Sequence, residues 1–311
     1  MRRQALRATR WLLLLFLSGA TTSLVHAQPD TLRVMAWNIL HGAGDIPNGR
    51  QYAVEIIRAL DPDIILMVET YGSGPAMAEA LGMRFHLVAE TGTPPDDERV
   101  NLSVFSKFPF GKRLDTDYPF YLGGREVLVN GRPLRVLSNW WHYDPWHDAP
   151  ETMGLSVEEL LTWEKSGTKW SMFQKVLPYF RRFARQADSV AVIVGGDMNT
   201  PSHLDWTTRT EALHGGLVVP WQTTRAMEDL GYIDSYRQVH TDPQTHPGIT
   251  WDTKGVRDEH RIDYIYYKGS RLRAVDSKIY MAHLGDFIRL GGKEMPYPSD
   301  HGIVLTTFVL E

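Results

Sequence analysis

Two apolar segments near the N-terminus, separated by a helical pattern, restrict the fold of this chain more than any other feature. Residues Thr31 to Asn38 alternate as a β-strand does, and residues 64–68 form a continuous apolar run that leads to Glu69. Between them, residues 51–60 carry apolar side chains at helical spacing, and an Asp-Pro-Asp sequence ends the helix. This strand–helix–strand unit predicts a sheet with Asn38 and Glu69 at its rim, where open α/β sheets place their binding sites.

The C-terminal end of the chain also places polar residues next to an apolar run. Asp300 and His301 stand side by side just before the apolar run 303–310, which we expect to be a buried strand. Neighbouring residues on extended backbone point in opposite directions, so both side chains face one cleft only if they lie in the loop before the strand. The alternative is a surface Asp–His pair at the start of a C-terminal strand.

Further apolar runs lead to polar residues in the same way. The hairpin signal Asn130-Gly131 precedes a strand that continues into the aromatic loop 140–148, and the run 189–194 leads to a Gly-Gly-Asp-Met-Asn sequence. A late strand, residues 262–267, contains Asp263. Eight polar residues next to or within apolar runs are therefore predicted to lie at one edge of the sheet: Asn38, Glu69, His142, Asp197, Asn199, Asp263, Asp300 and His301.

Part of this set is suited to a divalent cation. Glu69 and Asp300 offer hard oxygen ligands and Asn38 a neutral one, which suits Mg²⁺, Mn²⁺ or Ca²⁺ better than zinc. The histidines are too scattered for a zinc motif, and this disfavours a secreted zinc hydrolase of unrelated fold.

The other members of the set are suited to phosphate ester chemistry. His142 and His301 can donate hydrogen bonds to a phosphate oxygen. Asp197 can orient or deprotonate a water, with Asn199 fixing the geometry.

Six motifs in order, spanning nearly all of the chain after residue 27, resemble the endonuclease/exonuclease/phosphatase superfamily. This superfamily has a pancreatic-deoxyribonuclease-like fold and includes AP endonucleases, bacterial sphingomyelinases and inositol-phosphate 5-phosphatases. The resemblance implies an α/β (α+β) four-layer sandwich, in which two packed mixed β-sheets are flanked by helices. The motifs are Val34-Met35-Ala36-Trp37-Asn38, Asp63-Ile64-Ile65-Leu66-Met67-Val68-Glu69, Asn101-Leu102-Ser103-Val104-Phe105-Ser106-Lys107, Gly196-Asp197-Met198-Asn199, Arg261-Ile262-Asp263-Tyr264-Ile265 and Ser299-Asp300-His301.

The resemblance also implies a role for each residue. Glu69 would be the main metal ligand, with Asn38 and Asp300 near the same cation. Asp197 would activate the attacking water with support from Asn199, and His301, oriented by Asp263, would contact the scissile phosphate. Many members have a His-Leu pair after the middle strand, where the histidine helps to hold the phosphate. His142 is the match in this chain, although Tyr143 stands in place of the leucine.

Residues 1–27 are expected to be a signal peptide. They combine four arginines, an apolar stretch from Trp11 to Leu17 and a Val-His-Ala cleavage site before Gln28. The apolar stretch is short for a membrane span, although an uncleaved N-terminal anchor is the alternative. The chain has no cysteine, and we expect residues 28–311 to form one domain that is secreted or periplasmic.

The charge of the chain bears on its substrate. Removing four arginines with the signal peptide lowers the formal net charge from −4 to −8, which disfavours a broad basic face for duplex nucleic acid. We therefore expect a phosphodiesterase or phosphatase acting on a small phosphodiester, a nucleic acid or a phospholipid head group, with Mg²⁺, Mn²⁺ or Ca²⁺ as cofactor. A secreted nuclease, a sphingomyelinase-type phospholipase and a non-catalytic binding module are the alternatives. We expect a monomer with no obligate protein partner.

Overall fold

The structure, a computed structural model, describes residues 30–251 and 260–311. The expected signal peptide, residues 1–27, lies outside the described residues. Among the helices that the structure describes, none is both long enough and apolar enough to cross a membrane.

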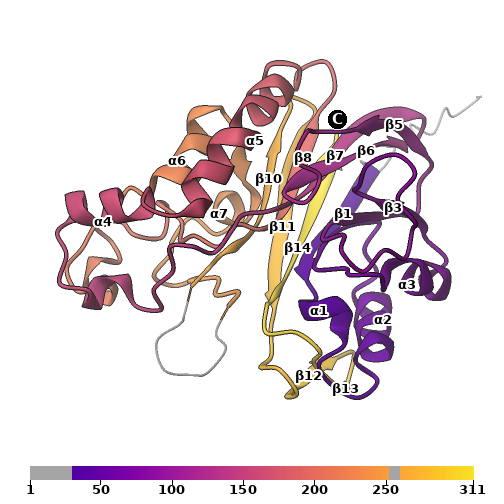
Figure 1. The fold of residues 1–311 in the computed structure, drawn as a ribbon, viewed down its shortest axis with the longest axis horizontal. Coiled ribbons are helices and arrows are strands. Elements are labelled where there is room, and N and C mark those ends of the chain that lie inside the picture. The colour runs from indigo at the N-terminus through magenta and orange to yellow at the C-terminus, as the bar shows by residue number, and fades with distance from the viewer. Residues whose placement is uncertain (1–29, 252–259) are drawn as a thin grey trace, which may run out of the picture.

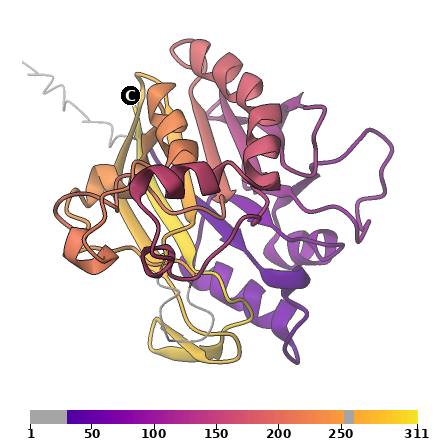
Figure 2. The same ribbon diagram turned by 60° about the vertical axis from the view of Figure 1, so that its left-hand side comes forward.

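Two six-stranded mixed sheets form the centre of the molecule (Figure 1). The first has the order β11 (Leu272–Tyr280), β14 (Ile303–Leu310), β1 (Asp30–Asn38), β2 (Ile64–Val68), β4 (Ser103–Ser106) and β3 (Arg84–Leu87). The second has the order β5 (Phe110–Leu114), β6 (Leu122–Val129), β7 (Arg132–Trp140), β8 (Val192–Asp197), β10 (Asp263–Lys268) and β9 (Ile233–Asp234). Figure 2 shows a separate hairpin, β12 (Phe287–Leu290) and β13 (Lys293–Pro296), at the lower edge of the molecule.

Helices cover the outer face of each sheet, as Figure 1 shows. The first sheet carries α2 (Gly49–Leu60) and α3 (Gly74–Leu81), and the second carries α5 (Thr168–Arg185) and α6 (Gln222–Asp229). The remaining helical elements are α1 (Leu40–Ala43), α4 (Val157–Glu164), α7 (Ser235–Val239) and 3₁₀ turns at Pro150–Thr152 and Glu211–His214. The predicted four-layer sandwich of two mixed sheets flanked by helices is confirmed.

Three of the four apolar clusters among the described residues follow from this layering. Side chains that alternate to the inner faces of both sheets, such as Val34, Leu66 and Ile193, are buried together between the sheets. The opposite faces pack against helices, with Trp37 and Ile56 in one outer core and Phe173 and Val194 in the other. Continuous apolar runs form the central strands because these strands are buried on both faces.

The site is positioned by the parallel strand pairs of the two sheets. β1 pairs in parallel with β2, and β7 pairs in parallel with β8, while the remaining pairings are antiparallel. The carboxyl ends of these pairs carry Asn38, Glu69 and Asp197. Hydrogen bonds from the Asn38 side chain to both carboxylates bring the two rims together.

Two glycines allow close packing below this site, one between the two sheets and one between neighbouring strands. A Cβ atom on Gly195 would lie 2.8 Å from a methyl group of Leu66 in the facing sheet. A Cβ atom on Gly196, where φ is +149°, would lie 1.9 Å from the backbone oxygen of Asn139. The Gly-Gly pair before Asp197 is therefore a packing requirement of the fold.

We expect Gly196→Ala to destabilise the protein by at least about 3 kcal/mol, because steric overlap with a backbone oxygen adds to an unfavourable φ. Gly82→Ala is the matched control, since Gly82 has a φ of +66° but no heavy atom within 4 Å of the added Cβ. The control should cost only about 1–2 kcal/mol. Urea unfolding of both variants measures the difference, and equal losses would contradict the packing argument.

Candidate active site

Glu69 is held at the end of β2 by contacts to its backbone and its carboxylate. Its amide donates to Asn101 Oδ1 at 2.9 Å, and its φ of 57° turns the chain sharply after the strand. The carboxylate accepts from Asn38 Nδ2 at 3.1 Å through Oε1 and from the backbone amide of His41 at 3.1 Å through Oε2. The position of Glu69 is therefore fixed by three residues from two neighbouring segments.

Asn38 links the two sheets from a fully buried position. Besides its bond to Glu69, its Nδ2 donates to Asp197 Oδ2 at 3.2 Å. Its Oδ1 accepts from the amide of Leu40 at 3.1 Å, and its backbone oxygen accepts from Ser299 Oγ at 2.6 Å. The amide side chain thus orients two carboxylates of the site.

Asp197 and Asn199 form a compact turn after β8. The Asn199 amide donates to Asp197 Oδ1 and its Nδ2 to Asp197 Oδ2, both at 2.9 Å. Asn199 Nδ2 also donates to the backbone oxygen of Trp141, and Lys169 Nζ donates to the backbone oxygen of Asn199. Burial raises the pKa of Asp197 to about 7, although the positive charge of His301 opposes this shift.

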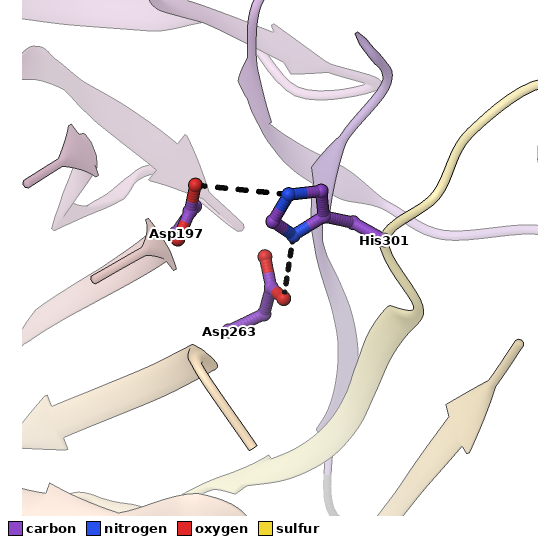
Figure 3. Close-up of side chains that lie close together, drawn as sticks. All are labelled: Asp197, Asp263 and His301. Carbon is purple, nitrogen blue, oxygen red and sulfur yellow. Dashed lines mark hydrogen bonds and ion pairs between the residues drawn. The ribbon is translucent and has the colours of Figure 1, made fainter. Parts of the chain in front are cut away.

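His301 lies between Asp263 and Asp197, as Figure 3 shows. Its Nδ1 lies 3.0 Å from Asp263 Oδ2, and its Nε2 lies 3.9 Å from Asp197 Oδ2 and 3.9 Å from Asp300 Oδ1. Asp263 and Asp197 are paired residues of β10 and β8, so the sheet itself sets their spacing. The loop is held at Ser299, whose Oγ accepts from the His301 amide at 3.0 Å.

The electrostatics favour a protonated histidine. Burial lowers the pKa of His301, but the carboxylates of Asp263 and Asp197 outweigh that effect and raise the pKa to about 10. Burial raises the pKa of Asp263, and the imidazolium opposes that shift through charge and a hydrogen bond. His301 is therefore a cation near neutral pH, with Nδ1 directed to Asp263 and Nε2 left toward Asp197 and Asp300.

Two groups of residues have the chemistry to hold a metal ion. Asp197, Asp263 and His301 each offer a ligand atom, and these atoms lie within 4.8 Å of one another. However, the His301–Asp263 hydrogen bond already uses Nδ1, and a protonated imidazole binds no metal. Glu69 and Asp300 remain the predicted cation ligands: both line one cleft, and Asp300 Oδ1 is buried without a hydrogen-bond partner among the described residues.

His142 lies apart from the predicted site residues that line the cleft. Its Nδ1 accepts from the Asp144 amide at 3.2 Å and lies 2.6 Å from Thr168 Oγ1. The residue in register with Asp197 on the neighbouring strand is Trp140, two positions earlier. Tyr143 stacks on the His142 ring at 4.4 Å between centroids and lines the cleft, whereas His142 is not among the lining residues described.

A cleft of about 550 Å³ opens over this group. Five of the eight predicted residues line it (Glu69, Asp197, Asn199, Asp300 and His301), while Asn38 and Asp263 are buried behind the surface. Sequence reasoning did not single out several further members: Leu40, His41, Tyr71, Asp148 and Trp251 line the cleft, and Lys169 supports it from behind.

Of these further members, only His41 carried a usable signal in the sequence. It follows Asn38 by three residues and pairs with Asp45 four residues later, at 3.0 Å through Nδ1. Trp251 and Lys169 reach the site through tertiary packing, which no local pattern reveals.

The family model described as "Endonuclease/Exonuclease/phosphatase family" matches residues 35–301. An uncharacterised protein of Caenorhabditis elegans, F14F9.5, is 23% identical over 272 residues, covering 83% of this chain and 85% of that protein.

Solved structures similar to this chain have the same fold. Truncated TDP2 from Caenorhabditis elegans is 18% identical, with a TM-score of 0.55 over 90% of this chain and 97% of that chain. An AP endonuclease from Archaeoglobus fulgidus is 17% identical, with a TM-score of 0.52 over 90% and 99%. The human Nocturnin catalytic domain with bound sulfate is 18% identical, with a TM-score of 0.53 over 91% and 98%.

The match to the family model begins within β1 and ends just before β14. It includes every predicted site residue. The chain therefore belongs to the endonuclease/exonuclease/phosphatase family, a family of phosphoester hydrolases.

Proposed function

We propose that this protein is an exported, divalent-cation-dependent phosphoric ester hydrolase that directs water at phosphorus in line with the leaving group. The observation that carries the proposal is the buried His301–Asp263 pair, whose free Nε2 lies 3.9 Å from Asp197 Oδ2 on the floor of the cleft. A cationic donor beside a carboxylate with a raised pKa is an arrangement suited to general acid–base chemistry.

Each side chain has a proposed task. His301 donates through Nε2 to a non-bridging phosphate oxygen, while Asp263 keeps the ring oriented and protonated. Asp197 aligns the attacking water and accepts its proton, and Asn199 holds both oxygens of that carboxylate. These groups stabilise charge where it develops in the transition state, and no covalent intermediate is required.

Glu69 and Asp300, with Asn38 beside them, would hold the cation. When bound, a Mg²⁺, Mn²⁺ or Ca²⁺ ion neutralises phosphate charge and polarises the phosphorus centre. Asn38 supports this role by fixing Glu69 Oε1 with its amide group. His142 contributes to the wall of the cleft through Tyr143 in this proposal.

The substrate is a small phosphate ester or diester in our proposal. One similar structure is described as D. rerio TDP2 complexed with single-strand DNA product, which makes a nuclease the principal alternative. The expected net charge of −8 after export favours the small substrate, because non-specific nucleic-acid affinity comes mainly from basic side chains. A sphingomyelinase-type activity on a lipid head group is a narrower variant of the same chemistry.

We further propose that residues 1–27 are removed on export and that the mature chain acts as a monomer in the periplasm or medium. N-terminal sequencing of the protein recovered outside the cytoplasm should begin at Gln28. A start at Met1 in a membrane fraction would instead support an uncleaved anchor.

Glu69→Gln should lower kcat/KM for bis-p-nitrophenyl phosphate by about 100-fold or more, because the cation loses its main charged ligand. The wild-type rate should vanish in EDTA and return with Mg²⁺ or Mn²⁺. Glu55→Gln is the matched control, since Glu55 pairs with Lys293 outside the cleft. Wild-type activity in EDTA, or an unchanged rate in Glu69→Gln, would overturn the mechanism.

The rate should fall at alkaline pH as His301 loses its proton, since its pKa is raised to about 10. Asp263→Asn removes the carboxylate that raises this pKa most, so the alkaline decline should move to lower pH by at least about one unit. Profiles of kcat/KM from pH 6 to 11 test this shift. A uniform loss of rate with an unmoved alkaline decline would show that Asp263 does not control the protonation of His301.

A further inference from the structure

The loop after β7 builds an aromatic stack at one wall of the cleft. The His142 ring is fixed through Nδ1 by Thr168 and Asp144, and it meets the Trp140 ring edge-on at 5.5 Å. The Tyr143 ring lies nearly parallel to it, with 4.4 Å between centroids and 24° between planes. One face of Tyr143 is therefore supported by a ring that is itself held from three sides.

The outer face of Tyr143 remains available to the cleft. Tyr143 lines the cleft while His142 lies behind it, and 55% of the Tyr143 residue surface is exposed. An exposed tyrosine backed by a fixed ring is a pre-organised stacking surface, because little side-chain freedom is lost when a third ring covers it. A phosphate group gains nothing from stacking on the face of a ring, so such a surface is suited to the organic part of a substrate.

The charges of the cleft restrict how much negative charge a substrate can carry there. Its described lining includes Glu69, Asp148, Asp197 and Asp300 but no lysine or arginine. A polyanion would bring several phosphates close to these four carboxylates. A ligand with one phosphate and an uncharged flat group suits the lining better.

We propose that Tyr143, supported by His142, is a specificity-determining residue that stacks on a flat aromatic group attached to the phosphate of the substrate. This inference rests on the proposed function and names its substrate class: small phosphate esters with one phosphate and one aromatic substituent. Tyr143 acts by binding, and the reacting atoms stay with His301 and Asp197.

Three phosphonates of equal charge isolate the aromatic contact. Methyl-, cyclohexyl- and phenylphosphonate are compared as competitive inhibitors of bis-p-nitrophenyl phosphate hydrolysis in the presence of Mg²⁺. Phenylphosphonate should bind about tenfold more tightly than methylphosphonate, and cyclohexylphosphonate should stay close to methylphosphonate, since stacking needs a flat π-face. Tyr143→Ala should reduce the phenyl preference to below about threefold, and Tyr143→Phe should retain it.

Phe287→Ala is the control variant, because Phe287 is also exposed but lies on β12 outside the cleft lining. It should keep the wild-type preference. Equal inhibition by phenyl- and methylphosphonate, equal inhibition by cyclohexyl- and phenylphosphonate, or a preference that survives Tyr143→Ala would each overturn the inference.

The two proposals fail in different ways. An active wild-type enzyme without phenyl preference leaves the hydrolase intact and removes the stacking site. A protein that hydrolyses no phosphate ester refutes the proposed function, and calorimetric binding of the same phosphonates then still measures whether Tyr143 selects the aromatic group.

Discussion

The geometry of the site depends on the hydrogen bonds made by the carboxamide group of Asn38. It is fully buried and donates to Glu69 and Asp197, which stand at the ends of strands in different sheets. The backbone oxygen of the same residue accepts from Ser299 and so anchors the loop that carries His301. Because a buried amide must satisfy its donors and acceptor, small displacements of either sheet would cost hydrogen bonds in several places at once.

This linkage explains how the site keeps several buried acids close together. Asp197 and Asp263 are directly paired across β8 and β10, and mutual repulsion would oppose their ionisation. His301 compensates by placing one imidazolium between them, which is why its pKa rises to about 10 despite burial. Asp197, Asp263 and His301 therefore influence one another's protonation below the cleft. The pairing of β8 with β10 keeps the two aspartates from separating to relieve their repulsion.

Sequence patterns predicted the strands and the polar residues at their ends because these are local features, whereas the two-sheet arrangement followed from the family resemblance. Apolar runs such as 64–68 and 303–310 identify buried strands, and the polar residue beyond each run marks the rim. The pairing of His301 with Asp263, 38 residues apart, followed only from the family resemblance and is present in the structure. Lys169 could not be found in this way, since its ammonium reaches Asn199 through helix packing and its sequence neighbourhood resembles any amphipathic helix.

His142 shows where local patterns stop being informative. Four consecutive aromatic or imidazole residues begin at Trp140, the last residue of β7, so no alternation between apolar and polar side chains defines which of them faces the cleft. Pairing with β8 resolves this question by placing Trp140 opposite Asp197, and the strand ends before His142. Beyond the strand, hydrogen bonds to Thr168 and Asp144 fix the His142 ring where it supports Tyr143. Which side chains of this loop line the cleft is therefore decided by inter-strand register and tertiary contacts, long-range properties that spacing within the loop does not contain.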